Sequence, residues 1–203
     1  MTAPQGKFPI IAIVHDDAIP AKVFAEFRDL VEAEGLDLLI DGREASGPSA
    51  GIEWLLPTAV VVFVGKAYFE SFLKEAGKDH YAMLKAGLSS LYKQFVGPDA
   101  PAVTVVSSAG KRPGGPQFSM LFSVLAEGND GVRFKLLIEP SASRERYEAS
   151  VRAFLSFLDE YHAGELEPDI QAELSNVRVV GRTLLLAFDA DLARVRAVDP
   201  LAR

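Results

Sequence analysis

Apolar and polar positions alternate along the chain in blocks that predict strands and helices in turn. Short apolar runs bounded by polar or turn-forming residues are typical of buried strands, and apolar positions three or four residues apart are typical of amphipathic helices. Strands are predicted at residues 8–14, 36–40, 59–64, 102–107 and 132–138. Helices are predicted at residues 21–34, 52–56, 67–76, 79–95, 143–161 and 170–174. This alternation indicates an α/β protein whose mostly parallel sheet has helices on both faces.

Two further segments lie outside this alternation of strands and helices. Residues 118–125 carry six apolar side chains that fit neither period, so the segment is compatible with a helix or an edge strand. Residues 182–200 contain an apolar strand, an Asp-Ala-Asp turn and an alternating strand, which predicts a β-hairpin. The expected fold is therefore a three-layer, flavodoxin-like domain with a five-stranded sheet in residues 1–163. Residues 164–203 form an extension, a short helix plus the hairpin, that packs on this domain.

The composition of the chain argues against several classes of protein function. The length of 203 residues suits one domain with an appendage, and the net charge of −7 disfavours a general nucleic-acid binder. The chain has no cysteine, which excludes disulfides, thiolate zinc sites and thiol nucleophiles. The first apolar run, residues 8–14, is too short for a signal segment or a membrane span. We therefore expect a cytoplasmic protein with neither nucleic-acid nor membrane partners.

Polar residues gather where predicted strands end. The segments in question are residues 15–17, 41–44, 65–71 and 107–112. In open parallel sheets, ligands bind at the carboxyl ends of the strands. The pattern therefore predicts that these four loops meet in one ligand site.

The stretch from Asp41 to Glu75 resembles the TIR (Toll/interleukin-1 receptor-like) domain family. That family has an acidic and Arg-containing segment after its second strand, a Pro-Gly loop, a short helix, an apolar strand and then Tyr-x-x-Ser. The matching residues are Asp41 and Arg43, then Gly47 and Pro48 in reversed order, then Tyr68 and Ser71. The resemblance covers roughly residues 8–161. Gly65 stands where the family usually has Ser, and the family's catalytic Glu falls by its usual spacing on Gly77, with Glu75 the nearest carboxylate.

The resemblance implies a bacterial protein of immunity or signalling that binds NAD or a related nucleotide. If it is an enzyme, it hydrolyses the nicotinamide–ribose bond with Glu75 as the catalytic carboxylate, so NAD is a substrate and no bound cofactor is expected. The residues expected to line the nucleotide site are Asp16, Arg43, Gly47, Tyr68, Ser71 and His80. Self-association is also expected, because many TIR domains work by assembling. The alternative is a TIR-like or flavodoxin-like module without catalysis that senses a ligand or docks a partner.

Each candidate residue also has a structural interpretation. Glu75 is equally typical of a solvated helix acid, and His80, near a predicted helix start, is equally typical of a structural histidine. His15, Asp16 and Asp17 are metal-ligating residue types, but their spacing matches no metal motif, so no metal site is predicted. A third functional option is a domain whose hairpin mediates dimerisation through an edge strand.

Overall fold

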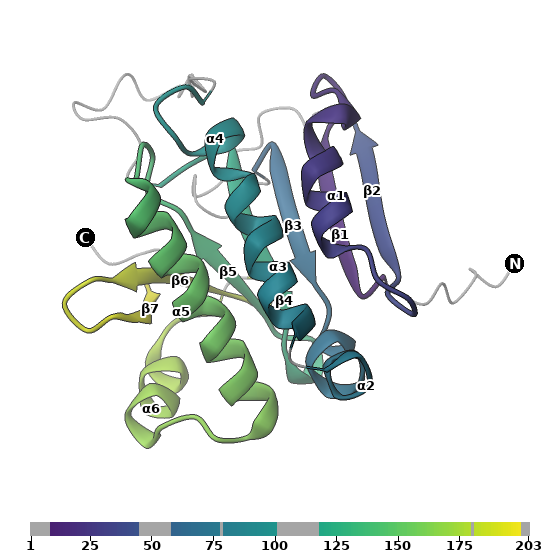
Figure 1. The fold of residues 1–203 in the computed structure, drawn as a ribbon. Coiled ribbons are helices and arrows are strands. Elements are labelled where there is room, and N and C mark those ends of the chain that lie inside the picture. Colours follow the sequence, from purple (N-terminus) through teal and green to yellow (C-terminus); the bar gives the residue numbers. More distant parts are fainter. Residues whose placement is uncertain (1–8, 45–57, 78, 101–117, 180, 200–203) are drawn as a thin grey trace, which may run out of the picture.

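The computed structural model describes residues 9–44, 58–77, 79–100, 118–179 and 181–199 (Figure 1). Several predictions fall outside these residues: the strand at 102–107, the helix at 52–56, the strand-end segment 107–112, and the candidate ligand residue Gly47. The sheet, the helices and the sites below are those of the described residues.

One sheet of seven strands forms the centre of the molecule, in the order β2-β1-β3-β4-β5-β6-β7. The strands are β1 (Ile11–Asp16), β2 (Leu38–Arg43), β3 (Val60–Val64), β4 (Phe122–Glu127), β5 (Arg133–Leu137), β6 (Thr183–Asp189) and β7 (Arg194–Val198). The prediction of five strands in a mostly parallel sheet is wrong. The α/β class itself is confirmed.

Strand direction alternates pair by pair. β2 is parallel to β1, β4 to β3 and β6 to β5, whereas β1 and β3, β4 and β5, and β6 and β7 are antiparallel. The pattern of apolar residues in a strand is the same in either direction, so the sequence pattern could not reveal these reversals. As a consequence, β1, β2, β5 and β6 have their carboxyl ends at one end of the sheet, and β3, β4 and β7 have theirs at the opposite end.

The three main described helices lie side by side on one face of the sheet (Figure 1). They are α1 (Ala25–Val31), α3 (Asp79–Ser90) and α5 (Arg144–Ala163). The other described helices are α2 (Leu73–Ala76), α4 (Tyr92–Phe95) and α6 (Pro168–Asn176), with 3₁₀ turns at Ala21–Phe24 and Asn129–Gly131 and a π-helical turn at Tyr68–Phe72. The expected layer of helices on both faces is thus not found among the described helices, whose long members form a single layer. No helix in the described part of the chain has the length and apolar character needed to cross a membrane.

The core lies between this helix layer and the sheet. Alternate residues of β3 and β4 that face the helices, such as Val62 and Val124, are fully buried, while Phe63 and Leu125 on the opposite face are half-buried. Because β4 carries apolar side chains on both faces, its sequence shows no strict two-residue period. The segment that was compatible with a helix or an edge strand is therefore a strand inside the sheet.

Helix α5, predicted at residues 143–161, spans Arg144–Ala163 and is capped at both ends. The Ser143 hydroxyl accepts a hydrogen bond from the Arg146 N–H at 3.2 Å, and Gly164 ends the helix with a left-handed φ of 74°. Tyr147, on its buried face, donates to the Leu88 carbonyl of α3 at 2.7 Å. Burial raises the pKa of the Tyr147 hydroxyl, so it stays protonated and keeps this hydrogen bond.

The C-terminal hairpin extends the sheet. β6 pairs in parallel with β5, and β7 forms the sheet edge. Helix α6 packs beside β7, and the backbone N–H of Ala197 in β7 donates to the Glu173 carboxylate of α6 at 2.8 Å. This edge of the sheet is therefore partly covered by α6.

Candidate functional site

Strand direction separates the predicted site residues into two groups. Asp16 and Arg43 are the last residues of β1 and β2, whose carboxyl ends lie at one end of the sheet. Tyr68, Ser71 and Glu75 follow β3, which is antiparallel to β1. They therefore lie at the opposite end of the sheet. The structure therefore does not bring these residues together into one nucleotide site.

The side chains at the carboxyl ends of β1 and β2 form hydrogen bonds and ion pairs with near neighbours in the sequence. The Asp16 carboxylate accepts from the Ala18 N–H at 2.9 Å, which closes a turn, and the Arg43 Nε pairs with the Asp41 carboxylate at 3.0 Å. Both members of this ion pair are exposed. His15 is buried, with its ring 4.7 Å from that of Phe24. Asp16 and His15 thus shape the loop and the core, and Arg43 sits in a surface ion pair.

Ser71 and Glu75 likewise show no shared pocket. The Ser71 hydroxyl donates to the Ala67 carbonyl one turn earlier, at 2.9 Å. Glu75 is exposed on α2, a single turn that ends at Gly77 with a positive φ of 82°. The structure thus places Glu75 as a solvated helix acid.

Tyr68 and His80 do meet, but in the core. Both are buried, and the Tyr68 hydroxyl lies 3.0 Å from His80 Nδ1. His80 Nε2 lies 2.8 Å from the Val31 carbonyl; since a carbonyl can only accept, Nε2 is the donor there. Burial raises the pKa of the Tyr68 hydroxyl, with a further contribution from Tyr81. This network joins the π turn, α3 and the end of α1, so these two residues hold the fold together.

A polar cluster that the sequence analysis missed lies at the carboxyl ends of β3 and β4. The Glu127 carboxylate accepts from the Lys66 N–H at 3.2 Å, and His162 Nε2 lies 3.0 Å from the Glu127 carbonyl. The His162 ring stacks on Phe69 with 5.1 Å between ring centroids, and Glu70 is a further charge nearby. Phe69 and Glu70 belong to the π turn, an irregularity that is frequent at functional sites.

The chemistry of this cluster is limited. It holds one imidazole, two carboxylates and one amine, but no group of three described side chains of the metal-ligating types could hold a metal ion. His162 Nδ1 is buried without a hydrogen-bond partner among the described residues. Burial lowers the pKa of His162, with Lys66 acting in the same direction, although the Glu127 carbonyl and the nearby carboxylates oppose the shift.

This pKa shift predicts a pH-dependent stability. A histidine whose pKa is lower in the folded state stabilises the fold above its unfolded pKa, and this contribution falls as the pH drops through that value. We expect the wild type to lose more free energy of unfolding between about pH 7.5 and about pH 5.5 than His162→Gln does. Urea denaturation of both proteins at each pH measures the difference. Parallel curves for the two proteins would contradict the assignment.

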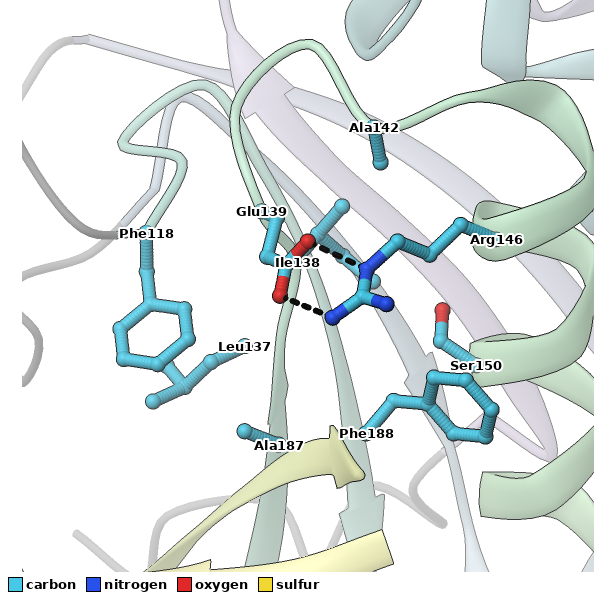
Figure 2. Close-up of a pocket in the computed structure, with 9 residues that line it drawn as sticks. All are labelled: Phe118, Leu137, Ile138, Glu139, Ala142, Arg146, Ser150, Ala187 and Phe188. Carbon is cyan, nitrogen blue, oxygen red and sulfur yellow. Dashed lines mark hydrogen bonds and ion pairs between the residues drawn. The ribbon is translucent and has the colours of Figure 1, made fainter. Parts of the chain in front are cut away.

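Several hollows of the described surface adjoin Phe188, near the end of β6. A small cavity between the ends of β5 and β6 and the first turns of α5 is drawn in Figure 2. Arg146 spans it and donates from Nε and Nη2 to the Glu139 carboxylate at 2.5 and 2.7 Å. The cavity holds only about 20 Å³, which is room for a water molecule and not for a larger ligand.

A larger cavity of about 340 Å³ lies on the other side of Phe188, between α5, α6 and the hairpin. Its volume falls in the range of small-molecule sites. Apolar side chains from all three elements line it, together with three charged ones. The apolar residues are Ala149, Ala153, Phe157, Ile170, Phe188, Ala193 and Val195, and the charged ones are Arg152, Glu160 and Arg194. We call this cavity the α5/α6 hollow.

Ion pairs hold the walls of the α5/α6 hollow. Arg194 of β7 pairs with Asp169 of α6 at 2.7 Å and lies 3.8 Å from Glu173, and Arg196 lies 3.5 Å from Glu173. Arg194 Nε is buried and has no hydrogen-bond partner among the described residues. Arg152 lines the hollow from α5, is exposed, and forms no ion pair with a described residue. The hollow therefore combines apolar side chains with an exposed guanidinium, that of Arg152, to which a ligand oxygen can bind.

Comparison with known proteins adds no assignment. No protein-family model, curated protein or solved structure matches the chain. The resemblance to the TIR family stays a prediction that rests on the residues quoted for it.

Proposed function

We propose that the protein is a non-catalytic, ligand-sensing module that takes a small molecule in the α5/α6 hollow. The observation that carries the proposal is a cavity of about 340 Å³ that is lined by apolar side chains, by Ser156 and by three charged groups, among them the exposed guanidinium of Arg152. Pockets of this kind, with a mostly apolar lining and a few polar groups that fix orientation, are typical of small-molecule sites.

The charges of the hollow define the ligand class. The exposed Arg152 guanidinium favours a ligand oxygen, either a carboxylate or a neutral carbonyl. Asp169 and Glu173 already offset the charge of Arg194, and Glu160 lines the same cavity. A polyanion such as the diphosphate of NAD would meet these carboxylates. We infer an apolar molecule with a single acceptor group.

The hydrolysis of NAD that the TIR resemblance implies has less geometric support. A carboxylate that stabilises an oxocarbenium-like transition state has to contact the sugar within a bound substrate complex. Glu75 is exposed on a one-turn helix, and Asp16 and Arg43 lie at the opposite end of the sheet. We therefore expect no catalytic role for Glu75.

Calorimetric titration tests the ligand site. We expect octanoate to bind saturably and its cationic analogue octylamine to bind at least about tenfold more weakly. Ala153→Phe places an aromatic ring in the hollow and should abolish octanoate binding, whereas Ala82→Phe, at an exposed position of α3, serves as the matched control. Equal binding to both variants would locate the ligand elsewhere and contradict the proposal.

The same preparations test catalysis. Nicotinamide release from NAD is measured for the wild type and Glu75→Gln at high protein concentration with a crowding agent. We expect no release from either protein. Release that disappears in Glu75→Gln would replace the sensing proposal with the glycohydrolase.

A further inference from the structure

The two edges of the sheet differ. At one edge, the Ala197 N–H of β7 donates to the Glu173 carboxylate of α6. At the other edge, β2 has a strand neighbour on one side only, and no described segment forms hydrogen bonds with its outer side. The side chain of Leu39 in the middle of β2 is 43% exposed. Open strand edges are templates for pairing with another strand.

Two hydrogen bonds reveal which backbone groups point outward. The carbonyl of Arg43 accepts from Asp17, and the carbonyl of Asp37 accepts from Ile10, so both of these carbonyls point toward β1. Successive residues of a strand direct their backbone groups to opposite sides. The N–H and C=O groups of Leu38, Ile40 and Gly42 therefore point to the open edge. They are available to a partner strand.

We propose that two copies of this chain associate through β2, antiparallel to each other, with Gly42 of one copy opposite Gly42 of the other. The two sheets then form one continuous sheet related by a two-fold axis. In this register Gly42 and its counterpart exchange both backbone hydrogen bonds. Registers with the two-fold axis at Ile40, Asp41 or Gly42 all bring outward-pointing backbone groups opposite one another, and the charge pattern around Gly42 selects the last of these.

Asp41 and Arg43 flank Gly42 on the same face of the strand, and they already pair with each other at 3.0 Å. With Gly42 at the axis, each Asp41 lies opposite Arg43 of the second copy, and the four charges alternate in sign. A two-fold axis at Asp41 would instead oppose two like charges, and an axis at Ile40 would oppose Leu39 and Asp41. Opposite charges in directly facing positions stabilise antiparallel strands, and like charges destabilise them.

The distance between the facing side chains is also suitable. Because Gly42 forms a hydrogen-bonded pair, the flanking Asp41 and Arg43 positions form non-hydrogen-bonded pairs, in which the facing Cα atoms approach to about 4.5 Å. Gly42 has no side chain, so nothing at the axis blocks the second strand. Pairing over so few residues buries little area, and we expect a concentration-dependent equilibrium and not a permanent dimer. The inference does not depend on the proposed ligand site.

Sedimentation equilibrium of the full chain tests the charge pairing. Asp41→Arg and Arg43→Glu each place like charges opposite one another, and we expect each to weaken the dimer by about tenfold or more. The double variant Asp41→Arg/Arg43→Glu restores opposite charges, and we expect it to regain most of the wild-type affinity. Arg144→Glu breaks an exposed ion pair with Glu148 on α5 and is the matched control, with no expected change. Circular dichroism verifies that every variant is folded.

Cysteine cross-linking tests the register, since the natural chain has no cysteine. Asp41→Cys and Arg43→Cys are prepared separately and then oxidised alone or as a mixture. We expect rapid disulfide formation in the mixture, where the two cysteines face each other, and little in either variant alone. A monomeric wild type at about millimolar concentration, no rescue in the double charge variant, or equal cross-linking in all three samples would overturn the proposal.

Discussion

We expect His80→Ala to remove about 3 to 5 kcal/mol from the free energy of unfolding. The substitution leaves the Val31 carbonyl without its 2.8 Å hydrogen bond and the Tyr68 hydroxyl without its 3.0 Å partner. The Tyr68 hydroxyl then keeps only its longer hydrogen bond, 3.3 Å, to the backbone carbonyl of residue 80. The space of the imidazole, packed against Phe72, is left empty. Most domains have only about 5 to 15 kcal/mol of stability, so this loss brings the protein close to unfolding.

The comparison with two further variants identifies the cause. Tyr68→Phe removes one hydroxyl and leaves His80 Nδ1 unpaired, so we expect a smaller loss of about 1 to 2 kcal/mol. Ser71→Ala, at an exposed residue with only a local hydrogen bond, should stay within about 0.5 kcal/mol of the wild type. Urea denaturation followed by circular dichroism measures all three. A folded His80→Ala protein of nearly unchanged stability would show that the buried network is not what holds these elements together.

His80 also shows what the sequence can and cannot predict about a candidate site residue. Its position near a predicted helix start and its titration near neutral pH are visible in the sequence and are compatible with either proton transfer or a structural role. The deciding fact is that the Val31 carbonyl at the end of α1 lies within hydrogen-bonding distance, 49 positions away in the chain. Such a contact depends on tertiary packing, which one sequence does not encode in any local pattern.

Local patterns predicted most elements well. The amphipathic face of α5 and the hairpin depend on neighbouring residues, and the structure confirms both of them. Strand order and direction depend on where the connecting segments cross the sheet. The antiparallel pairing of β1 and β3 is such a feature, and it separates Arg43 from Tyr68 although both follow strands as predicted.

The α5/α6 hollow cannot be predicted from the sequence for a related reason. The sequence indicates an extension at residues 164–203 and a ligand site at the carboxyl ends of a parallel sheet, and neither prediction points to a site between α5, α6 and the hairpin. The charges at Asp169, Glu173 and Arg194 alternate with apolar residues, which is also typical of any exposed helix or edge strand. Only their convergence in space, where α6 faces the hairpin, distinguishes them. The polar cluster around Glu127 and His162 was missed in the same way, since these residues are 35 positions apart.

We expect Gly87→Ala to destabilise the protein although alanine is the better helix former. Gly87 lies in α3 where it crosses α1, and an added Cβ would lie 2.4 Å from Val31 Cγ2 and 3.2 Å from Phe27. Val31 and Phe27 are fully buried, and a valine in a helix has one strongly preferred rotamer, so neither can easily move away. We expect overpacking of about 1 to 3 kcal/mol to exceed the helix-propensity gain of about 1 kcal/mol.

The neighbouring position separates these two effects. Ala86 is exposed one residue earlier in the same helix, so the loss caused by Ala86→Gly measures the propensity difference between alanine and glycine in α3 without a packing change. Gly87→Ala in the background of Val31→Ala then measures the clash, because the truncated side chain makes room for the new methyl group. We expect Gly87→Ala to be destabilising in the wild type and close to neutral or stabilising in Val31→Ala, as measured by urea denaturation. A stabilisation of the wild type equal to the Ala86→Gly loss would mean that α1 and α3 are farther apart than described. Because α1 and α3 cover adjacent parts of the sheet, the sign of this one substitution reports directly on how tightly the helix layer is packed.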